Sequence, residues 1–373
     1  MNQVRIALLI QILNSFVGGI VGVILPLMME ARQIDIVIIG FVFAAMPMIF
    51  QLGRMFFAIT SDFWGRKPFF VLNGLFSTIS NLIYYLADAT LGFAFGKVME
   101  GMKSASLWAV NRAFLMESSE RKWRILVHLR TVTYVSSAVG SLLAGFLVLL
   151  FFFEGTLMLC VLTGAFVIPI SLLLKGRSPR RKLNMAKALD VLDFRKRKKL
   201  FKGCLVLFFM MGLSFGFVSG FVYPLFLSHN GFDAGTIGVL LGLQIFLAGL
   251  VAYLFAGKFE IRKLIMLSGL LYTFTLISTG LSSSFIAGIL VVAYGAIEGL
   301  LSISQEGILS KITNEESYGT DIGLLWMGHH IGRTFSLAMS GLVISLLGFA
   351  APFLISALLY PFFYATSYFI LRE

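Results

Sequence analysis

The chain contains little charge and almost no cysteine for a protein of 373 residues. Charged residues make up 13% of it, whereas a soluble globular domain has about 25%. The two cysteines, Cys160 and Cys204, lie in apolar sequence without the spacing of a metal site. This composition excludes an ordinary soluble globule and a disulfide framework, and it favours two free, buried thiols.

Two motifs that carry common chemistry are also missing. The sequence has no His-Glu-x-x-His zinc motif and no Gly-x-x-x-x-Gly-Lys-Ser/Thr phosphate loop. His329 and His330 are adjacent, so on a helix they point to different faces and make a poor metal pair. We therefore expect no enzyme, no ATP-driven pump, no cofactor and no metal. A non-transporting sensor or an intramembrane enzyme stays a weaker alternative.

Apolar residues dominate what is present, at 58% of the chain. They form runs of about 20 residues or more, enough to cross roughly 30 Å of hydrocarbon as helices. We predict an all-α, polytopic membrane protein with twelve transmembrane helices. The predicted spans are Val4–Glu30, Asp35–Thr60, Pro68–Asp88, Thr90–Met116, Ile125–Phe153, Gly155–Leu174, Phe201–Ser228, Gly235–Gly257, Leu264–Leu281, Phe285–Ile312, Thr320–Leu347 and Pro352–Leu371.

The one long polar interval, residues 175–202, holds 12 of the 30 cations. So many cations cross a bilayer only at high cost, so we expect a basic cytoplasmic linker here. It separates an N-terminal six-helix bundle, residues 1–174, from a C-terminal six-helix bundle, residues 203–373. Outside this interval, cations lie in or beside every second loop, and the remaining loops contain one, Arg32. The cations at every second loop are Arg66, Lys67, Arg121, Lys122, Arg124, Lys258, Arg262, Lys263 and Lys311. This asymmetry predicts a multi-pass protein of the cell membrane with both termini cytoplasmic. Anionic lipid headgroups, rather than nucleic acid, are the expected partner for the net charge of +12.

The two halves repeat each other at a constant offset of 198 residues. The offset holds across three spans, which is uncommon by chance even in a glycine-rich apolar sequence. Two similar halves are typical of transporters with a site near the midplane, and they predict pseudo-symmetric bundles. The matched positions are Gly18 and Gly216, Gly22 and Gly220, Pro26 and Pro224, Asp35 and Asp233, Gly40 and Gly238, Glu100 and Glu298, Ser104 and Ser302, and Glu117 and Glu315.

A short charged stretch after the second span reads Ser-Asp-Phe-Trp-Gly-Arg-Lys over residues 61–67. It resembles the Gly-x-Leu-Ala-Asp-Arg-x-Gly-Arg-Lys signature of the major facilitator superfamily. The matching residues are Asp62, Gly65, Arg66 and Lys67. Alanine and phenylalanine replace the leading glycine and the first arginine. Lys97-x-x-x-Gly101 in span four resembles the second signature of that superfamily, with lysine in place of arginine.

The resemblance implies alternating access by rocking of the two halves. It also implies an ion pair between the basic loop and an acid at the end of span four, and Glu117 is placed to form it with Arg66. A solvated tight turn is the alternative for this motif. Drug–proton antiporters of the superfamily carry Gly-Pro-x-x-Gly-Gly in span five. Residues 140–145 read Gly-Ser-Leu-Leu-Ala-Gly instead, which argues against that subgroup.

Charged and amide side chains inside the predicted spans mark candidate functional positions, because an ionisable group costs at least about 2.5 kcal/mol at mid-bilayer. They lie on spans one, four, ten and eleven, and the resemblance implies that spans one, four, seven and ten line the cavity. The alternative for the cluster on span four is a self-neutralising structural group. The candidates for substrate binding or proton coupling are Asn14, Lys97, Glu100, Lys103, Glu298, Gln305, Glu306 and Arg333.

Taken together, these features predict a secondary active transporter of a small organic or amphiphilic solute, coupled to protons through Glu298 or Glu306. The apolar sequence around these two glutamates favours the neutral acid and lets a proton accompany the conformational change. A facilitated uniporter and a drug-type efflux antiporter stay alternatives. The lysines and Arg333 suit an anion and the acids suit a cation, so the charge of the substrate stays open. We expect a monomer that binds a small molecule.

Overall fold

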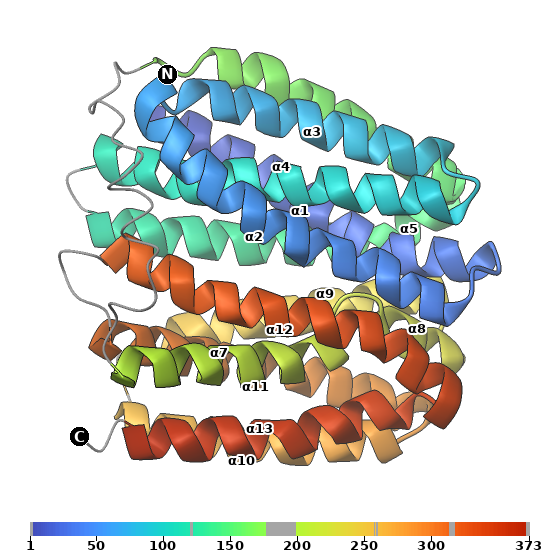
Figure 1. The fold of residues 1–373 in the computed structure, drawn as a ribbon. Coiled ribbons are helices and arrows are strands. Elements are labelled where there is room, and N and C mark those ends of the chain that lie inside the picture. Colours follow the sequence, from blue (N-terminus) through green and yellow to red (C-terminus); the bar gives the residue numbers. More distant parts are fainter. Residues whose placement is uncertain are drawn as a thin grey trace. The chain divides into compact units, whose positions relative to one another are not determined.

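A computed structural model describes residues 3–119, 122–176, 199–256, 258, 260–312 and 318–370. Within them the regular structure is helical, as Figure 1 shows, and no strand occurs. Most of the predicted basic linker, residues 177–198, lies outside the described residues. The helices are α1 (Gln3–Ala31), α2 (Ile36–Trp64), α3 (Lys67–Leu86), α4 (Thr90–Ser118), α5 (Lys122–Leu172), α7 (Lys199–Phe217), α8 (Val222–His229), α9 (Ala234–Phe255), α10 (Ile261–Leu281), α11 (Ser284–Ile312), α12 (Tyr318–Leu347) and α13 (Ala350–Ile370).

Helix α5 contains two of the predicted spans. It covers 51 residues, and Phe152 interrupts it with non-helical backbone angles (φ 58°, ψ −179°). An unbroken helix of that length would extend roughly 75 Å, more than twice the hydrocarbon thickness of a bilayer. The break falls within two residues of Glu154, where the sequence predicts the loop between spans five and six.

The predicted span 201–228 is not one helix. It divides into α7 and α8, and Gly220 between them has φ +67°, a left-handed angle that glycine adopts without a Cβ clash. Pro224 lies in the first turn of α8, where its missing N–H costs no helical hydrogen bond. Its repeat mate Pro26 lies inside the continuous helix α1. The repeat therefore predicts the position of the proline but not the break.

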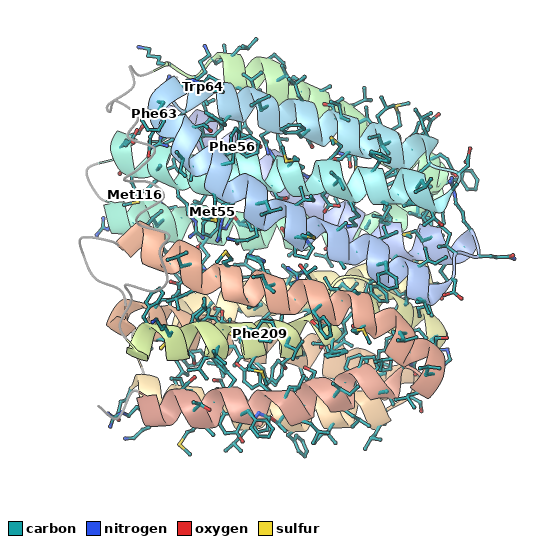
Figure 2. The ribbon with its side chains drawn as sticks, in the orientation of Figure 1. Met55, Phe56, Phe63, Trp64, Met116 and Phe209 are labelled. Atoms are coloured by element: carbon teal, nitrogen blue, oxygen red, sulfur yellow. The ribbon has the colours of Figure 1, made fainter. Side chains whose placement is uncertain are left out.

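Ten stretches in the described part of the chain are long and apolar enough to cross a membrane. The longest, residues 124–172, contains the two segments of α5. Helix α4 is not among the ten. It is long enough, with 29 residues, but it carries the charged residues Lys97, Glu100 and Lys103. Large apolar side chains such as Phe56 and Trp64 are exposed on α2, as expected of a surface that faces lipid (Figure 2). The chain is a multi-pass membrane protein.

The chain divides into two compact units. The first contains residues 1–34, 45–183 and 233–242, and the second contains 35–44, 184–232 and 243–373. Each unit thus includes the first nine residues of a helix that otherwise belongs to the other, together with the residue before that helix. The core of the first unit includes Ile10, Phe50, Phe70 and Phe114, from four different helices.

Residues related by the 198-residue offset have equivalent roles at the starts of α2 and α9. Asp35 accepts a hydrogen bond from the backbone N–H of Val37 at the start of α2, and Asp233 accepts one from Thr236 at the start of α9. A Cβ on Gly238 would lie 2.7 Å from a carbonyl oxygen of α5 in the first unit. One on Gly40 would lie 3.0 Å from a carbonyl oxygen of α12 in the second. Sequence similarity at the 198-residue offset therefore reflects equivalent caps and helix crossings.

We expect Asp233→Ala to destabilise the start of α9 by about 1 kcal/mol, the usual contribution of such a cap. Hydrogen bonds from the Thr236 hydroxyl and backbone N–H lower the pKa of the Asp233 carboxyl below its usual value. The cap therefore stabilises the fold fully above about pH 4 and loses its effect as the pH falls further through the lowered pKa. Thermal melts in detergent at several pH values test this. In wild type the melting temperature should fall below about pH 4 as Asp233 is protonated, and Asp233→Ala should lose this part of the pH dependence. The control is Asp88→Ala, an exposed side chain at the end of a different helix, which should keep it.

Candidate functional site

Glu100 on α4 is the centre of a buried polar group in the first unit. Its Oε2 atom lies 2.8 Å from Lys97 Nζ and accepts a hydrogen bond of 2.7 Å from the Tyr84 hydroxyl. Gly96 makes this possible, because a Cβ there would lie 2.2 Å from the Tyr84 ring. Lys97 is 5% exposed, so a paired carboxylate is what permits its charge inside the bundle. Sequence spacing predicts the Lys97–Glu100 contact, but not the tyrosine.

Asn14 and Lys103 lie deeper in the same unit. Asn14 donates to Asn73 Oδ1 on α3 (2.7 Å), and Asn73 donates to the Lys103 backbone carbonyl (2.9 Å). These bonds connect α1, α3 and α4. The Lys103 side chain is 7% exposed and interacts electrostatically with Glu100. The structure thus brings four of the predicted residues together, with Glu100 between two lysines.

Glu298 on α11 lies in a different environment, in the second unit. It interacts electrostatically with the buried side chains of Tyr223, Tyr272 and Tyr294. The rings of Tyr223 and Tyr294 have centroids 5.3 Å apart, and those of Tyr272 and Tyr294 are 5.7 Å apart. The buried Tyr223 hydroxyl has no hydrogen-bond partner in the described part of the chain. Equivalent acids of the repeat therefore lie beside two lysines in one unit and beside tyrosines in the other.

The remaining predicted residues of the second unit are more dispersed. Gln305 is partly buried and Glu306 is exposed on α11. Arg333 on α12 donates to the Ser219 hydroxyl (3.3 Å) and lies over the Phe215 ring, 5.2 Å from its centroid. Arg333 therefore contacts the segment where α7 ends.

The signature stretch is mostly helix rather than loop. Residues 61–64 form the last turn of α2, so only Gly65 and Arg66 separate α2 from α3, and the predicted start of the loop at Ser61 is wrong. The physical reason is Gly65, whose φ of +79° stops the helix in one residue. Arg66 Nη2 lies 2.5 Å from Asp62 and 3.1 Å from Glu117 at the end of α4. The structure contains the ion pair expected from the resemblance.

Comparison with known proteins decides the family. A family model described as the Major Facilitator Superfamily matches residues 7–259, more than half of the chain. The chain belongs to this superfamily. It is 23% identical to Multidrug resistance protein 2 of Bacillus subtilis (strain 168), over 92% of this chain and 90% of that protein.

Solved structures of major facilitator transporters have the same fold. The nucleoside transporter NupG has a TM-score of 0.81 at 13% identity, with 100% of both chains covered. A bacterial homologue of the human lysosomal transporter Spinster, inward-facing and unoccupied, has a TM-score of 0.76 at 14% identity, covering 99% of this chain and 96% of that one. The human organic anion transporter MFSD10 (TETRAN) has a TM-score of 0.67 at 16% identity, with 99% of both chains covered. At these identities the likeness shows the fold alone, and with the family match it identifies a membrane transporter, not an enzyme.

A Gly-x-Ser-x-Gly sequence at residues 212–216 does not alter that conclusion. In hydrolases this motif forms a strained turn between a strand and a helix. Here it lies within α7, and Ser214 is hydrogen-bonded to Ser356 (2.9 Å between the hydroxyl oxygens). In this member of the superfamily the two glycines serve packing, since a Cβ on Gly212 would lie 1.9 Å from the His329 carbonyl oxygen.

Residues 140–145, where span five differs from the drug–proton antiporter sequence, pack helices together. A Cβ on Gly140 would lie 2.1 Å from the Phe16 carbonyl oxygen, and one on Gly145 would lie 2.2 Å from the Ala234 carbonyl oxygen. Both contacts lie within the first unit. The small residues of this stretch are therefore needed for close helix approach, even without the proline of the drug–proton antiporters.

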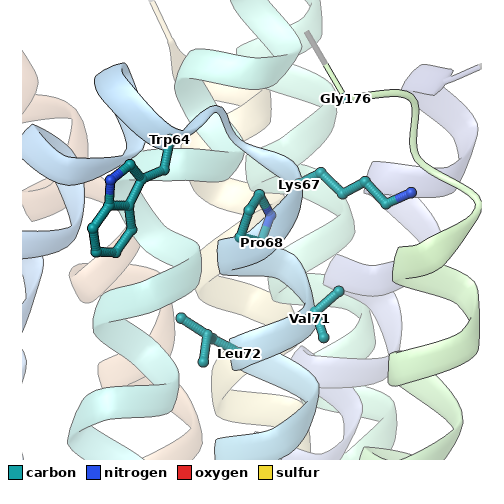
Figure 3. A pocket seen from close by; sticks show the side chains of 6 residues that line it. All are labelled: Trp64, Lys67, Pro68, Val71, Leu72 and Gly176. Carbon is teal, nitrogen blue, oxygen red and sulfur yellow. The ribbon is translucent and has the colours of Figure 1, made fainter. Parts of the chain in front are cut away.

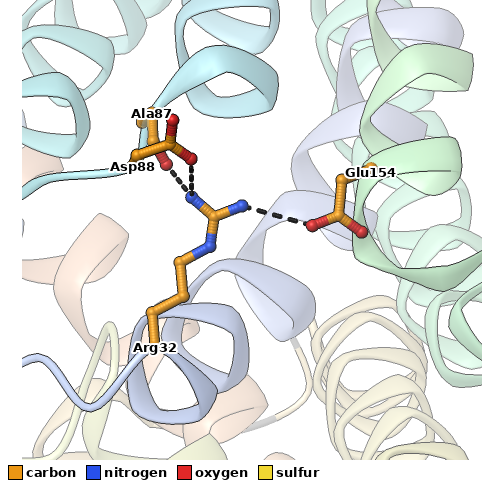
Figure 4. Close-up of polar contacts among 4 residues, drawn as sticks. All are labelled: Arg32, Ala87, Asp88 and Glu154. Carbon is orange, nitrogen blue, oxygen red and sulfur yellow. Dashed lines mark hydrogen bonds and ion pairs between the residues drawn. The ribbon is translucent and has the colours of Figure 1, made fainter.

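Arg32 connects the loop after α1, the loop after α3 and the part of α5 beside its break, at one end of the first unit of this transporter (Figure 4). Its guanidinium lies 3.3 Å from the Asp88 carboxylate and 3.2 Å from that of Glu154, and it also donates to the Ala87 carbonyl. Asp88 is 96% exposed, so its pair contributes little, whereas the carbonyl contact fixes the loop between α3 and α4. Arg32 thus stabilises the arrangement of these segments.

An open groove beside the signature stretch has a volume of about 570 Å³ (Figure 3). Apolar side chains form most of its wall, and Lys67 supplies a charge. Lys67 Nζ also donates to the Leu172 carbonyl at 2.7 Å. The lining residues are Trp64, Lys67, Pro68, Val71, Leu72 and Gly176.

Breaking the Arg66–Glu117 pair should loosen the short connection between α2 and α3. We expect Glu117→Gln to accelerate hydrogen exchange of the 61–68 segment two- to five-fold, because a partly exposed ion pair contributes about 0.2–1 kcal/mol. Mass-spectrometric exchange of the purified protein measures it. The control is Glu260→Gln, which removes the exposed Glu260–Lys263 pair in the other unit. Equal exchange of the segment in Glu117→Gln and wild type would show that the pair contributes nothing.

Proposed function

We propose that this protein is a secondary active transporter that moves a small organic or amphiphilic solute by alternating access and couples that movement to protons. The observation that supports this most directly is the placement of Glu100 and Glu298. Both are acids inside membrane helices, at equivalent positions of the repeat, and each interacts with buried polar side chains. Retained ionisable groups at such depth usually serve transport.

Proton coupling is assigned to Glu298 rather than Glu100. Glu100 has Lys97 as a close partner and Lys103 nearby, and two cations keep a carboxylate ionised. Glu298 interacts with the buried side chains of Tyr272 and Tyr294. We assign the coupling proton to Glu298 because Glu100 is already held in an ion pair with Lys97.

Two observations bear on the direction of transport, and they favour different candidates. The relative from Bacillus subtilis is named a multidrug resistance protein, which favours drug-type efflux as a second candidate. The span-five sequence lacks the proline of drug–proton antiporters, which favours a uniporter or symporter.

The conformational motif consists of Asp62, Gly65, Arg66, Lys67 and Glu117. It is proposed to favour one state of the transport cycle through the ion pairs of Arg66.

Replacement of Glu298 tests the function. In proteoliposomes with an imposed pH gradient, wild-type protein should accumulate at least one of three probes, namely uridine, ethidium or benzoate. Glu298→Gln should abolish gradient-driven accumulation of that probe while downhill counterflow persists. Glu260→Gln, an exposed acid, is the matched control. Accumulation that survives Glu298→Gln, or that persists after a protonophore collapses the gradient, would refute proton coupling through this residue.

We base the proposed membrane orientation on the charges of the loops. We place the protein in the cell membrane as a monomer, with both termini and the basic linker in the cytoplasm. Anionic headgroups are proposed to contact Lys67, and an acyl chain suits the apolar wall of the adjoining groove. Reporter fusions at each terminus test the orientation.

A further inference from the structure

A glycine lies four residues before a proline at three places in the sequence. The pairs are Gly22 and Pro26, Gly220 and Pro224, and Gly348 and Pro352. In an α-helix the backbone N–H of each residue donates to the carbonyl oxygen four residues earlier, and proline has no N–H to donate. At each of these places, the helical hydrogen bond that the proline removes is therefore the one to the glycine carbonyl.

Two of these places have the same geometry. Gly220 has φ +67° and Gly348 has φ +81°, both in the left-handed region. A helix begins two residues after each glycine, α8 at Val222 and α13 at Ala350. The proline is thus the third residue of its helix, where an N–H group has no helical partner. Its missing N–H removes no hydrogen bond there.

Helix α1 contains the third place, but it continues through it without a break (Figure 1). Pro26 lies in the interior of this helix, so one hydrogen bond is missing and the proline ring crowds the Gly22 carbonyl. A break at Gly22 with the geometry of the other two places would start a second helix at Ile24. Pro26 would then be the third residue of that helix, and both penalties would disappear.

The other prolines in helix interiors of the described chain do not have this alternative. They are Pro47, Pro169 and Pro361. The residue four positions earlier is phenylalanine in the first case and alanine in the other two. A residue with a Cβ rarely adopts a left-handed φ, whereas glycine adopts it without a steric clash. Among the described helices with an interior proline, α1 therefore combines the penalty with a residue that relieves it.

Gly22 has room to change its conformation. It is exposed, and no atom of a neighbouring helix lies within 4 Å of a Cβ added to it. Different contacts hold the two parts of α1 on either side of it. Before Gly22, the Gly19 carbonyl accepts a hydrogen bond of 3.2 Å from Ser141 on α5. After it, Arg32 at the end of the helix donates to the Ala87 carbonyl. The weak point of α1 thus lies between two anchors in the first unit.

We propose that α1 is a latent hinge, which opens at Gly22 into two helical parts in the way that α7 and α8 are already separated at Gly220. The repeat supports this, because the two glycines are equivalent at the 198-residue offset. The segments that follow them are also packed alike, since residues 23–29 and residues 222–227 are each buried throughout. As a step of alternating access, the opening rests on the proposed transport function.

Hydrogen exchange of the purified full-length protein tests the hinge. Opening at Gly22 releases the helical hydrogen bonds of the N–H groups of residues 22–25. After correction for intrinsic rates, these groups should exchange at least about ten-fold faster than those of residues 165–168, which precede Pro169 in α5. Gly22→Ala should slow the exchange of residues 22–25 about five-fold, because alanine favours the helix over glycine. Pro26→Ala restores the missing N–H and should slow it at least about ten-fold.

Gly18→Ala is the matched control. Gly18 is also exposed on α1, and no atom of a neighbouring helix lies within 4 Å of an added Cβ, so both alanine variants should fold. Gly18 does not precede a proline by four residues, so its variant should leave the exchange of residues 22–25 within about two-fold of wild type. Exchange of residues 22–25 no faster than that of residues 165–168, equal effects of the two glycine variants, or no slowing in Pro26→Ala would overturn the proposal. Because no flux is measured, this failure is separate from failure of the Glu298→Gln experiment.

Discussion

Gly19→Val should prevent correct folding of the first unit, whereas the same substitution at the adjacent Gly18 should be tolerated. A Cβ on Gly19 would lie 2.1 Å from the Ser137 carbonyl oxygen and 2.9 Å from the Ser141 backbone nitrogen. Both contacts are backbone atoms of α5, so no side-chain rotation relieves them. Overpacking costs about 1–3 kcal/mol where side chains can shift, and a clash with a rigid helix backbone costs more.

The crossing of α1 and α5 has further interactions to lose. Ser141 donates its hydroxyl to the Gly19 carbonyl (3.2 Å), and Ser137 donates to the Ser15 carbonyl (3.2 Å). In membranes, small residues and such interhelical hydrogen bonds are what hold helices together. Separation of α1 from α5 would break both bonds as well as the packing.

Fluorescence-detected size-exclusion chromatography measures the effect. Gly19→Val should give no monodisperse peak, and Gly19→Ala should give a peak with a lowered melting temperature. Gly18 has no atom within 4 Å of an added Cβ, so Gly18→Val is the control and should elute as wild type. A monodisperse, wild-type-like Gly19→Val protein would show that the close α1–α5 approach is not needed.

Glu100→Gln should destabilise the first unit more than Lys97→Met does. Loss of Glu100 leaves the buried ammonium groups of Lys97 and Lys103 without their nearby carboxylate, and leaves the Tyr84 hydroxyl with a weaker acceptor. Removal of one member of a buried pair typically costs about 3–5 kcal/mol. Loss of Lys97 leaves Glu100 with Lys103 and Tyr84, so its cost should be smaller.

The double variant separates the pair from its surroundings. Lys97→Met with Glu100→Gln should recover part of the stability lost in Glu100→Gln, because one uncompensated charge is then gone. Unfolding in a denaturing detergent titration gives the free energies for this cycle. The control is Glu260 and Lys263, which also lie three residues apart but are exposed, and their cycle should show almost no coupling. Equal effects of the two single variants would contradict the assignment of Glu100 as the shared partner of both lysines.

Local spacing and the repeat predict several contacts of the site correctly. Residues three apart on a helix face each other, so the Lys97–Glu100 pair follows from sequence. The Arg66–Glu117 contact follows from the family resemblance. The repeat matches Asp35 with Asp233, and the structure shows that both cap helices.

Other features depend on residues far apart in the sequence. Tyr84 reaches Glu100 because Gly96 leaves room for its ring. Arg54 and Trp108 lie on helices that only the packing of the first unit brings together. The break between α7 and α8 occurs at Gly220 inside an apolar run, where hydropathy gives no signal.

The sequence by itself determines that this protein crosses the membrane many times, repeats itself, and carries charge on particular spans. It does so because lipid solvates neither backbone polar groups nor ions, and apolar length and cation placement are visible residue by residue. Only the tertiary structure decides which side chains surround each charge. Glu100 lies between two lysines and Glu298 lies near tyrosines, although the repeat makes the two acids equivalent, because other helices bring different side chains to each of them.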